Sequence, residues 1–307
     1  MARPDKWLSD VTPRSKVRSV ARSALAAQLN RVSKNLRRAA KASLKEAEDI
    51  HRLRTSSRRA AAAVELFRPL LPKKRARWFE KQLKKIRRAA GEVRDLDVML
   101  EQAGEQGSGH SEENSELLNE LAKRRKRALQ PLKKLRGELE KSGKLARKQA
   151  GLLRDLKKPV AMQHAQPPRL REWAACRLAP QVRAFLALGA KRLTTVEAAH
   201  EFRIAGKELR YVLEVVGGAL PAAAARVYLL LGELQQKIGV ICDHAAAERM
   251  YGELLSMVHP ANRSYVRTKA GSAKKRRTLA HQAFLSWWRP RRRKALRTAL
   301  SGSVLLQ

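Results

Sequence analysis

Residues 51–58 read HRLRTSSR, and residues 200–211 read HEFRIAGKELRY. Both stretches follow the pattern H-x-x-R-x-x-x-R/K with no proline and few β-branched residues, which is typical of a helix. Because an α-helix turns by about 100° per residue, positions i, i+3 and i+7 lie within one narrow arc of its surface. Each stretch therefore presents one histidine and two cations. We call these the histidine rows: His51, Arg54 and Arg58 in the first, and His200, Arg203 and Lys207 in the second.

The two histidine rows belong to an internal repeat. Gly91 follows His51 by 40 residues, and an aspartate comes four residues after that glycine. In the second half, Gly239 follows His200 by 39 residues, again with an aspartate four residues later. Matching separations in helices of matching order indicate duplication. The sequence therefore predicts two helical bundles related by a pseudo-two-fold axis.

Composition predicts an all-α protein. The chain has 307 residues, of which 44% are hydrophobic and only 5% aromatic, with alanine, leucine, lysine and arginine dominant. Hydrophobic periodicity places helices over about 15–45, 48–69, 74–102, 117–149, 170–191, the His200 stretch up to 217, 222–257 and 278–300. Pro131 and Pro290 are expected to interrupt the fourth helix of each half.

Loop-like composition divides the chain. We expect loops over 104–115 and over the basic stretch 259–277. Residues 155–168 contain Pro159, Pro167 and Pro168 and are expected to be a linker. The resulting organisation is one domain over 1–307, with a first half over 15–150, a linker over 151–169 and a second half over 170–307.

Charge is the extreme feature of this sequence. Lysine and arginine number 67 against 28 acids, which gives a net charge of +39. Such a surface repels itself unless anions neutralise it, so a polyanionic partner is expected. Nucleic acid, an anionic membrane and inorganic polyphosphate all qualify on charge alone. A general compositional bias of the source proteome rarely reaches this extreme.

The C-terminal segment concentrates this charge. Residues 259–307 contain thirteen lysines or arginines and no acid, with dense clusters at 274–277 and 289–294. Nucleic acid or anionic lipid would suit these clusters. An over-charged outer surface of the last helix is an equally good interpretation, and both stay open.

Several classes of site are not indicated. Cys176 and Cys242 form no CxxC pair, and we expect them to be buried apolar residues in a reducing compartment. Cations stand where helical metal ligands would follow each histidine, and no P-loop or G-x-S-x-G motif occurs. Asp95 and Asp97 are expected to pair with nearby arginines. The N-terminal stretch contains no apolar signal region and no stretch is long enough to span a membrane, so we expect a cytoplasmic protein.

Further cations flank the histidine rows. On the helix after His51, Lys84 and Arg88 share a face with Asp95, so this row is expected to line the same groove, together with Arg94. The corresponding wall of the second half is expected to be weaker, with Lys237 as a substitute. An ordinary solvated helix face is the alternative for any single arginine. The remaining candidates for anion binding are Arg59 and Arg210.

The duplicated H-x-x-R rows, the segment GEVRDLDV at 91–98 and the stretch KELRY at 207–211 resemble the CHAD domain, the conserved histidine α-helical domain. The resemblance covers about residues 15–300. It implies two four-helix bundles around a central basic pore that binds inorganic polyphosphate, and proteins of this family are often found with polyphosphate granules. The residues that would line the pore are His51, Arg54, Arg58, His200, Arg203, Lys207 and Arg210. Gly206, Gly232 and Cys242 depart from the expected symmetry.

The sequence thus predicts a polyphosphate-binding protein without catalytic activity or cofactor, located at polyphosphate granules. A nucleic-acid-binding protein of the nucleoid is the second hypothesis, and a polyphosphatase ranks third. Because the first half is richer in supporting cations, it is expected to carry more of the affinity.

Overall fold

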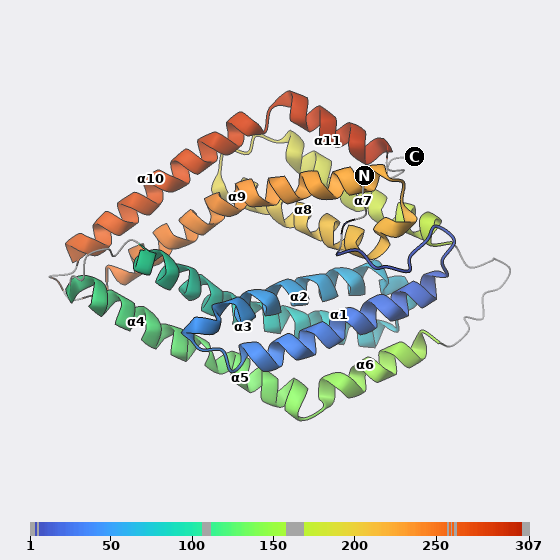
Figure 1. Cartoon of the computed structure of the whole chain (residues 1–307), viewed down its shortest axis with the longest axis horizontal. Helices are drawn as coiled ribbons and strands as arrows, with labels where there is room; N and C mark the ends of the chain where they lie inside the picture. Colours follow the sequence, from blue (N-terminus) through green and yellow to red (C-terminus); the bar gives the residue numbers. More distant parts are fainter. Residues whose placement is uncertain are drawn as a thin grey trace.

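The computed structural model describes residues 4, 6–105, 112–157, 169–256, 258, 260 and 263–302. Within these residues the chain is mostly helical and contains no β-strand, which confirms the expected all-α fold (Figure 1). The main helices are α1 (Val17–Ala39), α2 (Ala47–Leu66), α3 (Lys73–Glu105), α4 (Glu112–Ala128), α5 (Gln130–Arg136), α6 (Lys144–Asp155), α7 (Leu170–Ala190), α8 (Val196–Val216), α9 (Ala223–Leu254), α10 (Arg263–Trp287) and α11 (Pro290–Gly302).

The helices form two halves with the same packing order. In the first half α1 packs on α2, α2 on α3 and α3 on α4, and in the second α7 packs on α8, α8 on α9 and α9 on α10. Figure 1 shows α4–α6 and α10–α11 along the two outer edges of the molecule. The halves meet where α2 packs against α8 and α3 against α9. These contacts bring the two histidine-bearing helices side by side, while the pseudo-two-fold axis itself stays a prediction.

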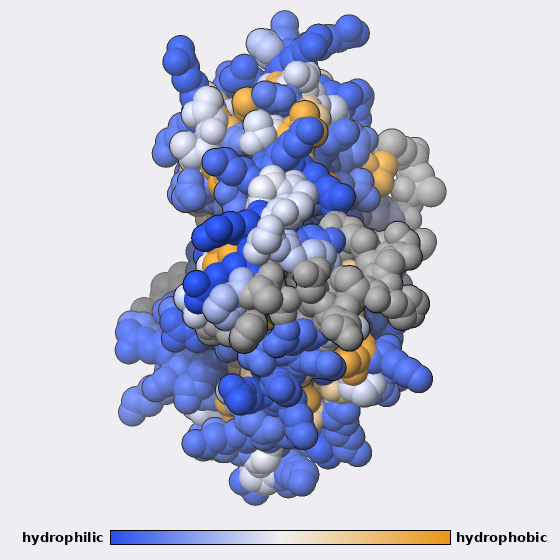
Figure 2. Space-filling model, turned by 90° about the vertical axis from the view of Figure 1, so that its left-hand side faces the viewer, coloured by the Kyte–Doolittle hydropathy of each residue, from blue (hydrophilic) through white to orange (hydrophobic). Residues whose placement is uncertain are grey.

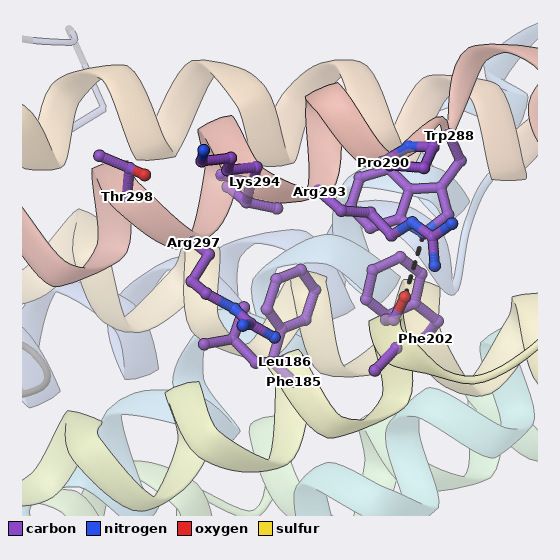
Figure 3. A pocket seen from close by; sticks show the side chains of 12 residues that line it. Phe185, Leu186, Phe202, Trp288, Pro290, Arg293, Lys294, Arg297 and Thr298 are labelled. Carbon is purple, nitrogen blue, oxygen red and sulfur yellow. Dashed lines mark hydrogen bonds between the residues drawn. The ribbon is translucent and has the colours of Figure 1, made fainter.

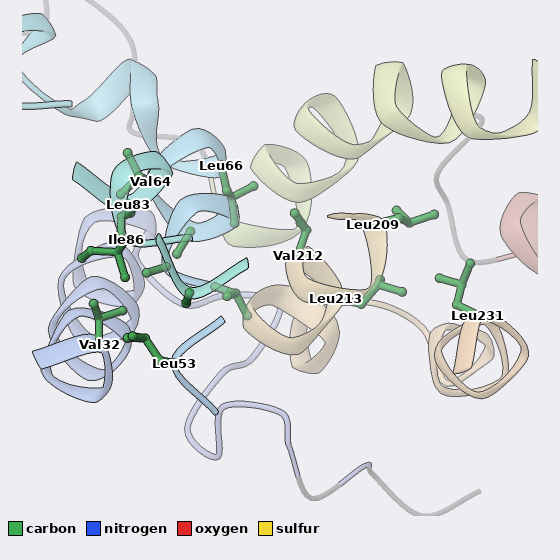
Figure 4. Close-up of a cluster of buried hydrophobic side chains, with 14 of the residues drawn as sticks. Val32, Leu53, Val64, Leu66, Leu83, Ile86, Leu209, Val212, Leu213 and Leu231 are labelled. Carbon is green, nitrogen blue, oxygen red and sulfur yellow. The ribbon is translucent and has the colours of Figure 1, made fainter. Parts of the chain in front are cut away.

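Local sequence explains the two central helices. On α2, Ile50, Leu53 and Val64 are buried at helical spacing, and the helix ends just before Pro69, which cannot continue its hydrogen bonds. On α8, the Thr195 hydroxyl accepts a hydrogen bond from the Ala198 backbone N–H at 3.1 Å and caps the helix. Figure 4 shows apolar side chains from both halves, including those of α2, α8 and α9, gathered in one core.

A buried ion pair fastens α2 to α8. The Arg59 guanidinium donates two hydrogen bonds to the Glu214 carboxylate, at 2.5 and 2.9 Å, and the side chains are only 16% and 3% exposed. Tyr228 donates a third hydrogen bond to Glu214 at 3.0 Å, and burial together with Glu214 raises the pKa of Tyr228 to about 12. The guanidinium also lies 5.3 Å from the centre of the Tyr211 ring. This cluster fixes how the two histidine rows face each other.

The aspartates at 95 and 97 pair with arginines, as predicted. Asp95 accepts from Arg54 at 3.3 Å, and Asp97 accepts from the buried Arg125. Arg125 also donates to the carbonyl oxygens of residues 42 and 43, so it ties α4 to the connection between α1 and α2. Asp97 therefore has a structural role.

The expected loop over 259–277 is wrong, because α10 begins at Arg263 and continues to Trp287. Gly271 and the dense positive charge suggested a loop, but Val266, Ala273 and Phe284 are buried at helical spacing in the same core as α9. Packing therefore outweighs a weak local propensity. Pro290 begins the separate helix α11, so a break at this proline is confirmed. Residues 259, 261 and 262 lie outside the described residues.

The other connections are described only in part. Residues 151–155 of the expected linker form the last turn of α6, and residues 158–168 lie outside the described residues, as do 106–111 of the expected loop over 104–115. The expectation that both cysteines are buried is wrong: Cys176 is exposed and Cys242 is half-buried, and both are free thiols. Cys176 is exposed because it lies on the outer face of α7, opposite the buried residues Ala174 and Leu178.

Candidate functional site: a cationic cavity between α2 and α8

Both histidine rows line one cavity of about 680 Å³ between the two halves. We call it the central cavity. Helices α2 and α3 form one side, and α8 and α9 form the other. Its lining contains six lysines or arginines and two histidines against four carboxylates. The cationic members are His51, Arg54, Arg58, Arg94, His200, Arg203, Lys207 and Arg249.

The central cavity continues along α2 and α8 into a second hollow of about 400 Å³. The two share Arg58, Ile204, Lys207 and Tyr211, so these four residues lie at the junction. Lys84 and Arg87 of α3 line the second hollow, and so do three carboxylates, those of Glu65, Glu80 and Glu208. From residue 51 to residue 65 of α2, the combined cleft is roughly 20 Å long, at about 1.5 Å per residue. Its shape suits an extended chain.

A glycine on the neighbouring helix lies beside one arginine of each row. Arg54 Nη1 donates to the carbonyl oxygen of Gly91 at 2.9 Å and lies 3.8 Å from where a Cβ would be. In the second half, Arg203 Nη2 lies 3.3 Å from the corresponding position on Gly239. A side chain at Gly239 would press on the Arg203 guanidinium, whereas a Cβ at Gly91 would make an ordinary van der Waals contact with Arg54. Gly239 therefore has a steric explanation that the sequence alone did not provide.

Two cations at the junction lack a close acidic partner among the described residues. Within the described residues, neither Arg58 nor Lys207 forms a hydrogen bond or an ion pair. Burial, with the nearby charges of Arg203, Arg58 and Arg54, lowers the pKa of Lys207 to about 7. Burial and Arg54 also lower the pKa of Arg58. Desolvation and like charge both disfavour the protonated form, and a bound anion would reverse the second effect.

The two histidines experience the same field. The pKa of His51 is lowered mainly by burial, and Arg94 and Lys207 add to this against the opposing charge of Glu48. The pKa of His200 is lowered by burial and then by Arg203. His200 Nδ1 lies 3.5 Å from the Cys242 sulfur. Cys242 occupies the position on α9 that corresponds to Arg94 on α3. The second half therefore lacks a cation at this position, but Arg249 gives it the same number of cations in the central cavity as the first half.

The structure separates the predicted residues into two groups. The histidine rows, Arg94 and Lys84 line the cleft. Arg59 is held by Glu214, and Arg210 packs inside the second half, where it donates to Gln235 at 3.1 Å and lies 4.3 Å from the Tyr228 ring centre. Arg88 and Lys237 are exposed and line neither the central cavity nor the second hollow.

Sequence reasoning missed Arg249, which lines the central cavity from α9. The sequence did contain a pattern that indicates it. Spacings of four and three residues place Cys242, Ala246 and Arg249 on one helix face. Following this face for two turns beyond Cys242 would have identified Arg249 as a candidate.

A different cavity, of about 660 Å³, lies between α7 and α11 (Figure 3). Phe185, Phe202 and Trp288 form its apolar part, and the cations that line it come from α11. Neither histidine row reaches it. The face of the molecule in Figure 2 is mostly hydrophilic, in keeping with a chain that carries 95 charged side chains of the Lys, Arg, Asp and Glu types.

Two further observations limit the chemistry of the described residues. None of their helices is long and apolar enough to cross a membrane. They also contain no group of three or more histidine, cysteine or carboxylate side chains that could hold a metal ion. The central cavity carries more cations than carboxylates, and this excess of positive charge suits it to binding an anion.

Comparison with known proteins gives a consistent result. The family model described as "CHAD domain" matches residues 5–252. Among solved structures, the CHAD domain from the plant Ricinus communis is 20% identical, with a TM-score of 0.70, and the match covers 98% of this chain and 96% of that one. PptA from Streptomyces chartreusis is 19% identical, with a TM-score of 0.60, and the match covers 89% and 99%. These two similarities concern the fold. No curated protein matches the chain.

Proposed function

The chain belongs to the CHAD domain family, and we propose that it binds inorganic polyphosphate in the cleft between α2 and α8. One observation carries the proposal: Arg58 and Lys207, contributed by opposite halves, both line the junction of the two hollows and form no ion pair with any described residue. The charges of these two side chains contribute little to the stability of the fold, but they would stabilise a bound anion. A linear polyphosphate places a negative charge at every unit along the cleft.

Binding would be electrostatic. Arginine donates paired hydrogen bonds to phosphate oxygens, and lysine acts as a point charge. Each phosphate that a cation neutralises releases condensed counterions, so affinity should fall steeply with salt. A cleft of this volume accepts a single flexible chain, whereas a duplex is too wide to enter between the helices. The structural arrangement thus supports selectivity for a linear anion.

Competition tests this function against nucleic-acid binding. We expect duplex DNA, at equal phosphate concentration, to displace little labelled long-chain polyphosphate. The alternative rests on α10 and α11, which carry cations and no acid. Efficient displacement by duplex DNA would shift the site to that surface and contradict binding in the cleft.

Affinity should depend on pH. Bound phosphate favours the protonated forms of Lys207, His51 and His200, all of which have lowered pKa values in the free protein. Binding therefore takes up protons, and affinity falls as pH rises through about 7, where free Lys207 loses its proton. We expect a loss of about tenfold between pH 6 and pH 9, equivalent to one unit of linked pKa shift.

Titrations at constant ionic strength measure this pH dependence, and calorimetry in buffers of different ionisation enthalpy measures the proton uptake. The matched control is Lys207→Arg, whose charge is permanent, so its affinity should depend less on pH. An identical pH profile in this variant would show that Lys207 does not contact the anion.

We further propose that the protein binds polyphosphate without hydrolysing it, and that it associates with polyphosphate granules. Incubation with polyphosphate and magnesium should release no orthophosphate and should not shorten the chain. Granule association would follow from affinity for the polymer, and a fluorescent fusion should lose it when polyphosphate synthesis is blocked.

A further inference from the structure

A third basic hollow, of about 620 Å³, lies on the opposite flank of α2, between α1 and α2. We call it the α1 hollow. It shares His51 and Thr55 with the central cavity, so these two side chains form the ridge between them. His51 and Thr55 also lie 3.5 Å apart, from imidazole Nε2 to hydroxyl oxygen. A chain that leaves the central cavity at His51 therefore meets the α1 hollow directly.

The α1 hollow has more positive charge than its own acids neutralise. Among the described residues, Glu48 is the only carboxylate in its lining, and it pairs with Arg52 at 3.2 Å. Arg38 has only a long contact of 3.9 Å with Asp49. The cations in the lining are Lys6, Arg31, Lys34, Arg38, Arg52 and Arg59.

Three of these cations have no acidic partner among the described residues. Arg31 is exposed and donates only to the neutral amide of Gln28, at 3.4 Å. Lys34 lies one turn further along the same face of α1, exposed and without a hydrogen bond or ion pair in the described part of the chain. Lys6 reaches the α1 hollow from the N-terminal segment, and it too forms no hydrogen bond or ion pair with the described residues. Charge complementarity calls for an anion that spans this row.

The second half supplies no equivalent row. Helix α7 packs on α8 as α1 packs on α2, yet residues 181–190 of α7 contain a single cation, Arg183. Phe185, Leu186 and Gly189 of that segment line the largely apolar cavity of Figure 3 instead. The continuation of the cleft is therefore one-sided.

We propose that the α1 hollow holds the segment of a long polyphosphate chain that emerges from the central cavity past His51. This inference rests on the proposed function. A short polyphosphate fills the central cleft alone, whereas a long one also crosses the ridge and contacts Arg31 and Lys34. The protein thereby prefers long chains, since each extra phosphate contact releases further counterions. His51 then contacts the chain on both sides of the ridge.

The test compares two chain lengths with two double variants. Arg31→Ala/Lys34→Ala should lower the affinity for polyphosphate of more than about 100 units by roughly tenfold and reduce its salt slope by about 1.5, at about 0.7 per lost contact. Its affinity for tripolyphosphate should stay within about twofold of the original chain. Lys133→Ala/Lys134→Ala, on the exposed face of α5, removes the same charge elsewhere and should leave both affinities unchanged.

The binding results for the two double variants and the unaltered protein distinguish three explanations. Equal losses of long-chain affinity in the two double variants would contradict the α1 hollow and assign the effect to net charge. An equal loss for both ligands in Arg31→Ala/Lys34→Ala would place tripolyphosphate itself on α1 and overturn the proposed path. Failure of the unaltered protein to bind either ligand would instead contradict the proposed function.

Discussion

Replacing Arg58 and Lys207 together by glutamate is expected to lower polyphosphate affinity by at least about 100-fold. The reason is their place at the junction of the two hollows, where an entering chain must pass between them. Two unit charges 4 Å apart interact by about 4 kcal/mol at an effective dielectric constant of 20, so each reversal replaces a substantial attraction by repulsion. A binding titration with labelled polyphosphate at fixed ionic strength measures the change.

The fold should tolerate this pair of changes. Burial and neighbouring arginines lower the pKa of Lys207 to about 7, which means that its charge opposes folding. A carboxylate at either position would face Arg54 and Arg203 and gain partners. Changing Arg54 and Arg203 themselves is a less selective test, because Arg54 holds both Gly91 and Asp95. Circular dichroism and thermal unfolding should therefore show a folded, helical variant.

The matched control is Arg88→Glu/Lys237→Glu. It changes the net charge by the same amount, and both side chains are exposed outside the cleft. We expect this variant to keep affinity within about fivefold, since exposed charges are largely screened beyond a Debye length. If both double variants lose binding equally, the protein binds through its overall charge, and the cleft has no special role.

Periodicity predicted the fold class and the histidine rows because these properties are local. A spacing of three and seven residues fixes which side chains share a face, whatever that face contacts, so His51, Arg54 and Arg58 could be grouped from the sequence. The course of α10 could not be predicted in the same way. Its helix depends on burying Val266 and Phe284 in the core it shares with α9, a non-local contact that no window of α10 contains.

Neighbouring arginines show why the binding residues were harder to identify. Arg58 and Arg59 differ by one position, or about 100° around α2, yet one lines the cleft and the other is buried against Glu214. Glu214 lies 155 positions away in the sequence, and no local pattern links the two. Lys84 and Arg88 illustrate the same limit, because only Lys84 reaches the cleft.

Arg59, unlike Arg58, is paired with Glu214, and disrupting this buried ion pair is the second change with a large expected effect. Changing Glu214 alone to leucine should lower the free energy of unfolding by about 3–5 kcal/mol, because it leaves the Arg59 guanidinium buried without its counter-charge. Changing both residues to leucine should recover most of that loss, since two well-packed apolar side chains often replace a buried ion pair without cost. Tyr228 then loses its acceptor, which leaves a residual cost of about 1 kcal/mol.

Urea unfolding of the two single variants and the double variant measures the coupling as a double-mutant cycle. Polyphosphate affinity of the double variant then decides the role of Arg59. If Arg59 only fastens α2 to α8, the folded double variant should bind within about threefold of the unaltered chain, because every cation of the central cavity remains in place. A loss beyond tenfold in a variant that unfolds cooperatively would instead make Arg59 a ligand of the anion, reached from the α1 hollow that it also lines.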